Sequence, residues 1–170
     1  CLQRALLKVW ASLWNVEAFE ERRWYGIDHS AAAMGILVNT RSKNEQANFV
    51  AFTANPTSNS DDRMLVNAQI GELDVVSAGP GVIPEKTLLT VDAGTVTEVV
   101  RVSASSVVLP GVQVLSDNQL GELGGHLWTI REDLPIDAQP PTGRDLLLDT
   151  EWKVLEDGRM IIKQVRPFLR

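Results

Sequence analysis

The sequence contains few of the residues on which catalytic and metal sites most often depend. Its 170 residues include one cysteine, Cys1, and two histidines, His29 and His126. A single cysteine excludes an internal disulfide framework and a cysteine-based metal site, and because this composition fits a reducing compartment we expect a cytoplasmic protein. His29 falls in an expected turn and His126 on the flank of an expected helix. Both are predicted to be surface or core residues rather than ligands or bases.

Common signatures of catalysis and targeting are absent as well. The sequence has no Gly-x-x-x-x-Gly-Lys-Ser/Thr phosphate loop and no Gly-x-Ser-x-Gly nucleophile elbow. It shows no signal-peptide pattern and no apolar run of the about 18 residues that a membrane span needs, so we expect no membrane association. The net charge of −6 argues against nonspecific nucleic-acid binding. Because the chain opens on Cys1 rather than methionine, we expect an excerpt of a longer chain or a processed product.

The sequence does contain clear periodicity, beginning with two helices. Apolar residues between Leu2 and Trp14 recur at three- and four-residue spacing, which predicts an amphipathic helix. A second helix is predicted over about residues 15–25, ending at Gly26. Its basic residues Arg22 and Arg23 are expected to be exposed to solvent.

The middle of the chain has strand patterns. Strands are predicted from short apolar or alternating segments bounded by turn residues. They lie at residues 33–38, 48–53 and 64–70, followed by a β-branched antiparallel meander over 88–91, 95–102 and 107–109. The run 92–94, Asp-Ala-Gly, is the expected turn of the meander. Its residues show no evident chemistry, so we expect it to be structural support.

A third helix is predicted from Ser116 to about Asp133. Ser116 and Gln119 have the spacing of a capping box, and leucines at helical spacing follow. The glycines at 121, 124 and 125 each cost up to about 1 kcal/mol of helix propensity relative to alanine. Close packing against a neighbouring element is one reason to retain them.

The C-terminal segment, residues 146–167, predicts a β-hairpin around Asp157-Gly158. A two-residue turn there places Glu151 opposite Gln164 and Asp149 opposite Arg166. Side chains alternate along a strand, so these four residues share one face. The other face is apolar and carries the following residues, with Lys163 as the exception: Leu148, Trp152, Val154, Ile161 and Val165.

The polar face of this hairpin has two interpretations. Mg²⁺ prefers oxygen ligands, usually one or two carboxylates together with substrate phosphates, and a neighbouring arginine suits a polyphosphate. The face therefore has the chemistry of a Mg-nucleotide site. The alternative is a half-buried hairpin with a solvated polar face and one cross-strand ion pair.

Several segments, in order, resemble the ATP-binding region of pyruvate phosphate dikinase and phosphoenolpyruvate synthase, an ATP-grasp family. The most specific pair is Asp-Thr-Glu-Trp at 149–152 with Gln-Val-Arg-Pro at 164–167. The others are Val-Trp-Ala-Ser at 9–12, Met-Gly-Ile-Leu-Val at 34–38, Val-Ala-Phe-Thr-Ala-Asn-Pro at 50–56, Ile-Gly-Glu at 70–72 and Val-Val-Ser at 75–77. The similarity is weakest between about residues 88 and 115.

The resemblance implies specific roles for the hairpin. Glu151 and Gln164 match the positions that hold Mg²⁺ and the nucleotide phosphates. Asp149 and Arg166 match neighbouring active-site positions, and Arg166 is implied to act on phosphate as a catalytic residue. These positions agree with the register that the Asp157-Gly158 turn predicts.

The resemblance also implies an overall architecture. Glu72 matches a glutamate near the nucleotide, and Val38 and Asn39 match the segment at the adenine, where the family usually has glutamine instead of Asn39. The implied fold is α+β, residues 1–170 forming the C-terminal half of an ATP-grasp domain. This half has a mixed or antiparallel sheet, flanking helices, a C-terminal hairpin and a β-rich insertion at about 86–110.

The sequence departs from the family pattern at several positions. Phe49, Ala54 and Gln69 replace a usual glycine, arginine and glycine. These 170 residues do not include the family's lobe with a phosphate-binding lysine and arginine, and neither histidine matches the phosphoryl-accepting one, which the family has on a separate domain. We therefore expect ATP and Mg²⁺ as ligands, weak binding and no turnover by this chain alone. The phosphoryl acceptor (pyruvate, a glucan or an antibiotic) stays open. The alternative is a degenerate, non-catalytic remnant that docks a partner through the Leu/Trp face of its first helix.

Overall fold

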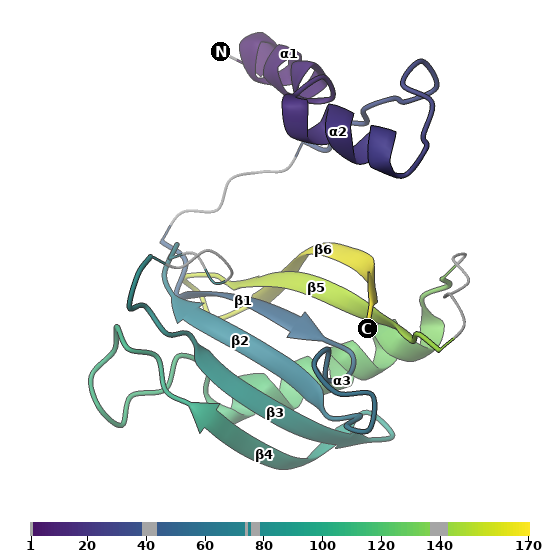
Figure 1. Cartoon of the computed structure of the whole chain (residues 1–170). Coiled ribbons are helices and arrows are strands. Elements are labelled where there is room, and N and C mark those ends of the chain that lie inside the picture. Colours follow the sequence, from purple (N-terminus) through teal and green to yellow (C-terminus); the bar gives the residue numbers. More distant parts are fainter. Residues whose placement is uncertain (1, 39–43, 74, 76–78, 137–142) are drawn as a thin grey trace. The chain divides into compact units, whose positions relative to one another are not determined.

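The structure, a computed structural model, describes residues 2–38, 44–73, 75, 79–136 and 143–170. The chain divides into two compact units, Cys1–Arg41 and Ser42–Arg170. The first unit contains helices, and the second contains a six-stranded sheet and one further helix (Figure 1). The predicted α+β class is confirmed. Among the helices of the described residues, none has the length and apolarity that crossing a bilayer requires.

The first unit contains the two predicted helices, α1 (Leu2–Ser12) and α2 (Val16–Trp24). Gly26 adopts a φ of +65°, a left-handed conformation that glycine accepts without strain, and the chain leaves the helical path there. Arg23 is exposed as predicted, with 73% of its side chain accessible.

The prediction that Arg22 is solvated was wrong. Only 7% of this residue is exposed. Its Nε donates to Nδ1 of His29 at 3.1 Å, and its guanidinium lies 5.4 Å from the centroid of the Trp14 ring. Phe19 stacks on His29 with 4.0 Å between ring centroids. A planar guanidinium packs well on aromatic faces, so these neighbouring rings remove Arg22 from solvent.

The predicted buried strand at residues 33–38 was also wrong. These residues are irregular, and Leu37 and Val38 are 77% and 65% exposed. A strand is stable only when a neighbouring strand takes up its backbone hydrogen bonds. In the described part of the first unit there is no other strand to do so.

The second unit is built on one antiparallel sheet with strand order β4-β3-β2-β1-β5-β6. The strands are β1 (Ala47–Phe52), β2 (Met64–Ile70), β3 (Glu85–Asp92), β4 (Thr95–Ser103), β5 (Leu146–Val154) and β6 (Met160–Leu169). The predicted strands therefore form, including the meander turn at Ala93 and Gly94, both of which have positive φ. The exception is 107–109, which lies in turns. The N–H of Val112 there donates to the oxygen of Leu109 at 3.0 Å.

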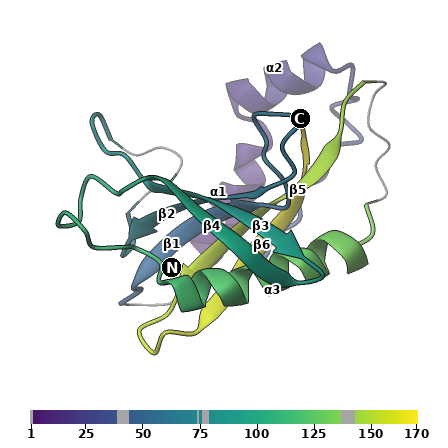
Figure 2. The ribbon, with the colours of Figure 1, turned by 90° about the horizontal axis from the view of Figure 1, so that it is seen from below.

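Helix α3 (Asp117–Asp133) lies along one face of the sheet (Figures 1 and 2). The predicted capping box is present: the N–H of Gln119 donates to Oγ of Ser116, and the N–H of Ser116 donates to Oε1 of Gln119. The buried core lies between helix and sheet and is formed mainly by Phe49, Met64, Val66, Leu89, Leu115, Leu120, Leu123, Leu127, Trp152 and Val154.

Helix α3 approaches the sheet at its glycines. A Cβ atom added to Gly124 would lie 2.2 Å from Cγ2 of Val96 and 3.3 Å from Cγ2 of Val91. One added to Gly125 would lie 3.3 Å from the carbonyl oxygen of Gly94. Close packing is therefore the reason for two of the helix's glycines. Within the second unit, no described helix covers the opposite face of the sheet, which we call the open face.

Candidate functional site

The C-terminal hairpin forms, but its turn is one residue longer than predicted. The N–H of Leu155 donates to the oxygen of Arg159 at 2.9 Å, so the loop comprises residues 156–158. A two-residue turn of the favoured type needs positive φ at both central residues. Only Gly158 provides it, at +84°, while the Asp157 carboxylate accepts the N–H of Arg159 at 3.1 Å. The Arg159 side chain also holds the pKa of Asp157 below its ordinary value.

A β-bulge in β6 compensates for the longer turn. Trp152 lies opposite Ile162 and Glu151 lies opposite Gln164, which leaves Lys163 as the extra residue. Beyond the bulge, Asp149 lies opposite Arg166, so both predicted pairs are confirmed. Between turn and bulge the faces differ from those predicted. Ile161, predicted on the apolar face, lies opposite Lys153 instead.

The two predicted pairs lie on the open face and contact each other. Nε of Arg166 donates to Oδ2 of Asp149 at 2.7 Å, and Nη2 of Arg166 lies 4.0 Å from Oε1 of Glu151. Nζ of Lys163 lies 3.9 Å from the other oxygen of Glu151. The Asp149 side chain is 4% exposed, whereas that of Arg166 is 54% exposed. The buried carboxylate therefore orients a guanidinium that still reaches solvent.

Asp149 has one oxygen without a partner. Its Oδ1 is buried and accepts no hydrogen bond from any described residue. A buried polar atom without a partner costs roughly 1–3 kcal/mol, and such atoms often mark functional sites.

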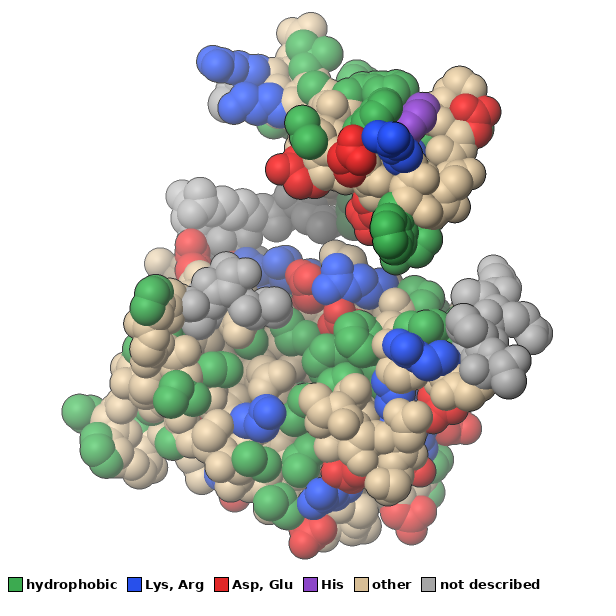
Figure 3. Space-filling model, viewed as in Figure 1, with side chains coloured by type: hydrophobic (Ala, Val, Ile, Leu, Met, Phe, Trp, Pro, Cys, Tyr) green, Lys and Arg blue, Asp and Glu red, His purple; other side chains and the backbone are tan. Residues whose placement is uncertain are grey.

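Two neighbouring cavities hollow the open face, which Figure 3 shows with charged side chains beside apolar ones. The first, which we call the Glu151 cavity, has a volume of about 360 Å³, and its charged lining residues are Glu45, Glu72, Glu151, Lys153 and Lys163. The second, the Arg166 cavity, has a volume of about 680 Å³. Its polar lining residues are Asn67, Lys86, Ser103, Asp149 and Arg166.

The structure thus brings most of the predicted site residues to one face. Glu72 and Glu151 line the same cavity, and Asp149 and Arg166 line the adjacent one. Gln164 lies opposite Glu151 and is exposed.

The remaining predicted residues lie elsewhere in the chain. Val38 is an exposed residue of the first unit, and Asn39 lies outside the described residues. The predictions of nucleotide contact at these two positions stay predictions.

The sequence interpretation missed two lysines of the site. Lys163 appeared only as an exception to the alternation, and that irregularity was the signal of the bulge. Lys86 lies in β3, just before the predicted meander segment at 88–91, and the sequence predicted no role for it. Because β3 pairs with β2, Lys86 lies opposite Asn67 and lines the Arg166 cavity.

The donor set suits one particular class of cation. No group of three or more His, Cys, Asp or Glu residues that could hold a metal occurs within the described ranges. Mg²⁺ does not require one, since it usually takes one or two carboxylates together with water and substrate phosphates. Glu151 and Gln164 lie side by side, and the Glu151 side chain is 35% exposed. These residues fit Mg²⁺ that arrives with a phosphorylated ligand.

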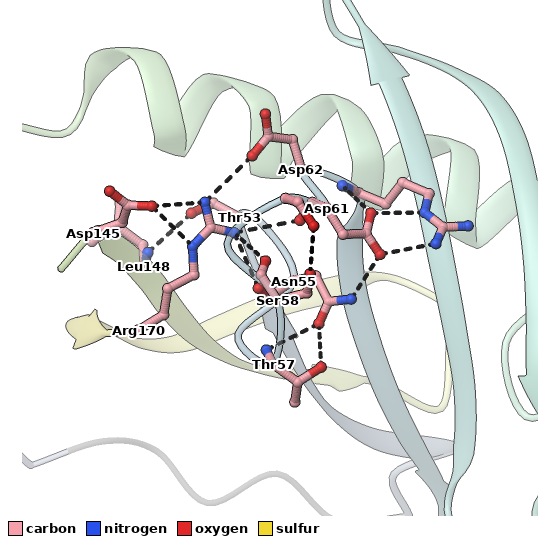
Figure 4. Close-up of polar contacts among 11 residues, drawn as sticks. Thr53, Asn55, Thr57, Ser58, Asp61, Asp62, Asp145, Leu148 and Arg170 are labelled. Atoms are coloured by element: carbon pink, nitrogen blue, oxygen red, sulfur yellow. Dashed lines mark hydrogen bonds and ion pairs between the residues drawn. The ribbon is translucent and has the colours of Figure 1, made fainter. Parts of the chain in front are cut away.

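A polar cluster around Arg170 lies at the end of the sheet, close to Leu148 of β5 (Figure 4). The Arg170 side chain is only 7% exposed, and its Nη1 donates to the carbonyl oxygens of Asn55, Ser58 and Asp61 at 3.0–3.3 Å. Its Nη2 lies 3.2 Å from Asp145 and 3.4 Å from Asp62. We call this cluster the Arg170 clasp.

The loop that the clasp holds is connected to β5. Oγ1 of Thr53 accepts the N–H of Leu148 at 2.9 Å, next to Asp149. Asp61 closes the loop internally, accepting from Arg63 and from Asn55 at 2.8 Å. Hydrogen bonds from the Arg63 side chain hold the pKa of Asp61 well below its ordinary value.

Removing the clasp should open this loop. We expect Arg170→Ala to lower the free energy of unfolding by roughly 1–2 kcal/mol, a moderate loss because water can reach the freed carbonyls. Hydrogen exchange should accelerate in residues 53–62 but not in α3. Arg144→Ala is the control, since Arg144 donates to the Arg170 oxygen but not to the loop. Unchanged exchange in the loop would contradict this role for Arg170.

The fold and the site together define a class of protein. Helix α3 covers one face of an antiparallel sheet, and the other face presents carboxylates, lysines and an oriented arginine. This arrangement is typical of a domain that binds a phosphorylated ligand. The family model for the AMP/ATP-binding domain of pyruvate phosphate dikinase matches residues 2–170, and the chain belongs to this family. It is an ATP-binding domain of the dikinase type.

The chain is also similar to parts of longer proteins. It is 27% identical over 173 residues to a probable phosphoenolpyruvate synthase of Pyrococcus horikoshii, covering 94% of this chain and 21% of that protein. A phosphoenolpyruvate synthase of Aeropyrum pernix is 26% identical over 168 residues, and this match covers 95% of this chain and 20% of that protein. The chloroplastic alpha-glucan water dikinase of Solanum tuberosum is 37% identical over 79 residues, 45% of this chain and 5% of the relative. The chain spans about one fifth of the length of the synthases.

Proposed function

We propose that this chain is the C-terminal half of an ATP-grasp domain and supplies the Mg-ATP-binding face of a larger, cytoplasmic dikinase-type phosphotransferase. The observation that carries the proposal is the hairpin register. It places Glu151 beside Gln164 and Asp149 beside Arg166 on the open face of the sheet. A solvated structural hairpin would not need the buried, half-satisfied carboxylate of Asp149.

Each residue has a distinct role in this proposal. Glu151 and Gln164 hold Mg²⁺, which when bound offsets the charge of the nucleotide phosphates. Arg166, oriented by Asp149, donates to a phosphate oxygen and stabilises the negative charge on it during transfer. The Glu151 cavity, which Glu72 also lines, takes the nucleotide.

The proposed reaction needs parts beyond these 170 residues. In the larger enzyme, a further lobe with a lysine and an arginine would close over the nucleotide, and a histidine on a mobile domain would accept the phosphoryl group. The similarity to phosphoenolpyruvate synthases and to an alpha-glucan water dikinase leaves pyruvate, a glucan or another final acceptor open. With half of the phosphate contacts, the chain alone should bind Mg-ATP weakly and not turn it over.

The test of the proposal is Glu151→Gln, which removes one negative charge from the metal site. Isothermal titration of the chain with Mg-ATP should show affinity reduced at least about tenfold, because a carboxylate ligand of Mg²⁺ is lost. Without Mg²⁺, the variant should bind ATP no more weakly than the wild type. The matched control is Glu122→Gln on α3, on the helix-covered side of the sheet, which should change neither affinity. Equal Mg-ATP affinity of Glu151→Gln and wild type would contradict the metal assignment.

A second candidate function is a non-catalytic remnant that binds a partner through α1. Its support is that α1 has no buried residue and exposes Leu2, Leu7 and Trp10 at 62%, 57% and 51%. A second support is Gln69, which replaces a glycine of the family pattern. It is fully buried, and its Oε1 accepts a hydrogen bond from Oγ of Ser105 at 2.7 Å, so here it has a structural role. The parent gene distinguishes the candidates. An upstream Lys/Arg lobe and a downstream histidine domain would favour the enzyme, and a gene that encodes this domain alone would favour the remnant.

A further inference from the structure

We infer that Lys163 determines which cations enter the proposed metal site: as the counter-ion of Glu151, it disfavours a free divalent cation and favours one that carries a polyphosphate. This inference deepens the proposed function and rests on it for the place of Mg²⁺ and the phosphates. It assigns Lys163 a role in selectivity, in addition to the roles proposed for Glu151, Gln164 and Arg166. Three observations on the open face support it.

The first observation is the side of the sheet on which Lys163 lies. Strict alternation with Gln164, its neighbour on the open face, would place Lys163 on the helix-covered face. Lys163 is instead the extra residue of the β6 bulge, and it lines the Glu151 cavity on the open face. Bulges re-aim side chains in this way, often beside functional sites. The irregularity of the strand therefore brings an ammonium group to Glu151.

The second observation is the distance of two cations from the Glu151 carboxylate. Nζ of Lys163 lies 3.9 Å from Oε2, and Nη2 of Arg166 lies 4.0 Å from Oε1. Hydrogen bonds between such groups are about 2.7–2.9 Å long, so neither cation donates one to Glu151 at these distances. The two cations therefore offset the charge of the carboxylate without occupying the lone pairs that a metal ion takes.

The third observation is that the two lysines that line the Glu151 cavity differ in their surroundings. Lys153 forms an ion pair with Glu45, whose side chain is fully buried, and the Lys153 side chain itself is only 17% exposed. The Lys163 side chain is 41% exposed, and its ion pair with Glu151 is long. The flexible four-carbon stem of a lysine lets its ammonium group follow a ligand. Lys163 is therefore better placed than Lys153 to exchange a carboxylate for a phosphate.

These charges determine which form of a divalent cation the site prefers. A free cation on Glu151 would meet the Lys163 ammonium, which lies beside the same carboxylate, and the like charges would repel each other. A cation that carries a polyphosphate brings negative oxygens to which Lys163 can donate instead. The repulsion is then replaced by a charge-assisted hydrogen bond. Lys163 thus lowers the affinity for the free cation and raises the affinity for the phosphates.

The test compares the wild type with Lys163→Met, which keeps the length of the side chain and removes its charge. Free Mn²⁺, a paramagnetic stand-in for Mg²⁺, is titrated without nucleotide and followed by electron paramagnetic resonance. ATP is titrated in the presence of EDTA by isothermal calorimetry. We expect Lys163→Met to bind Mn²⁺ about fivefold more tightly and ATP about fivefold more weakly, the effect of one partly exposed charge.

Three further variants assign the effect to this site. Lys163→Arg keeps the charge and should stay close to the wild type in both affinities. The double variant Glu151→Gln/Lys163→Met should lose the gain in Mn²⁺ affinity, because the gain depends on the Glu151 carboxylate. Arg159→Met is the control: it removes a positive charge at the turn of the same hairpin, where Arg159 pairs with Asp157, and should change neither affinity.

Opposite changes in the two affinities would support the inference, because the loss of a merely structural lysine would not strengthen Mn²⁺ binding. Unchanged or weaker Mn²⁺ binding by Lys163→Met would overturn it, and so would a gain that survives in the double variant. If Glu151→Gln lost Mg-ATP affinity while Lys163→Met changed neither affinity, the proposed function would stand and this inference would fall. If no chain bound ATP, the proposed function would fail, whereas a gain in Mn²⁺ affinity that requires Glu151 would still support Lys163 as its counter-ion.

Discussion

Replacing Gly124 by alanine should lower the free energy of unfolding by roughly 2 kcal/mol, the cost of overpacking a core contact, although alanine is the better helix former. The added Cβ would lie 2.2 Å from Cγ2 of Val96, far inside van der Waals contact. Val96 is β-branched and has few alternative rotamers, and Val91 blocks a second direction at 3.3 Å. Helix α3 would have to move away from β3 and β4.

Two variants separate this steric effect from helix propensity. Gly121 lies in the same helix with nothing within 4 Å of its Cβ position, so Gly121→Ala should raise stability by up to about 1 kcal/mol. Removing the opposing methyl groups with Val96→Ala should recover part of the loss in a Gly124→Ala background. The free energy of unfolding is measured by urea unfolding, followed by circular dichroism, for the wild type, Gly121→Ala, Gly124→Ala and the double variant Val96→Ala/Gly124→Ala. A stabilised Gly124→Ala variant would contradict the close contact.

The elements that the sequence predicted best are those whose signals are local. The capping box of Ser116 and Gln119 and the turn at residues 92–94 depend on neighbouring residues, and both form as predicted. The strands at 48–53 and 64–70 show strong apolar patterns and find partners within the same unit. Each of these elements is therefore determined by residues that lie close to it in the chain or beside it in the sheet.

The predictions that were wrong depend on neighbours that the pattern does not contain. Residues 33–38 have the composition of a strand, but no described strand of their unit can pair with them. Arg22 has the sequence context of a solvated residue, but the rings of Trp14 and His29 surround its guanidinium. In both cases the outcome was set by tertiary contacts, which periodicity does not report.

The register of the two hairpin pairs was predicted correctly, but for an incomplete reason. The two-residue turn was wrong by one position, and the bulge at Lys163 restores the register before Glu151. The prediction counted cross-strand partners outward from the turn. Such counting cannot detect a longer turn and a bulge that offset each other. Lys86 could not be assigned to the cavity that Arg166 lines, because β3 and β6 are not adjacent in the sheet and only the folded unit shows that both residues line it.

Arg166→Ala should affect stability and nucleotide binding together. It leaves the Asp149 carboxylate buried at 4% exposure with neither oxygen paired, which should cost about 2–3 kcal/mol of unfolding free energy. The same change removes a donor to phosphate, so Mg-ATP affinity should fall about tenfold or more. Arg159→Ala is a matched control in the same hairpin. Its Nε also lies 2.7 Å from an aspartate, Asp157, but that side chain is 53% exposed. Breaking this exposed pair should cost no more than about 0.5 kcal/mol.

The double variant Asp149→Asn/Arg166→Ala separates the two roles of the arginine. Neutralising the buried carboxylate removes the penalty of an unpaired charge, so the double variant should regain most of the stability that Arg166→Ala loses. Mg-ATP affinity should stay low, because the phosphate donor is still missing. Urea unfolding and isothermal titration on the four chains of this cycle measure both quantities. If affinity recovered together with stability, Arg166 would act only by neutralising Asp149, and its assignment to a nucleotide phosphate would be wrong.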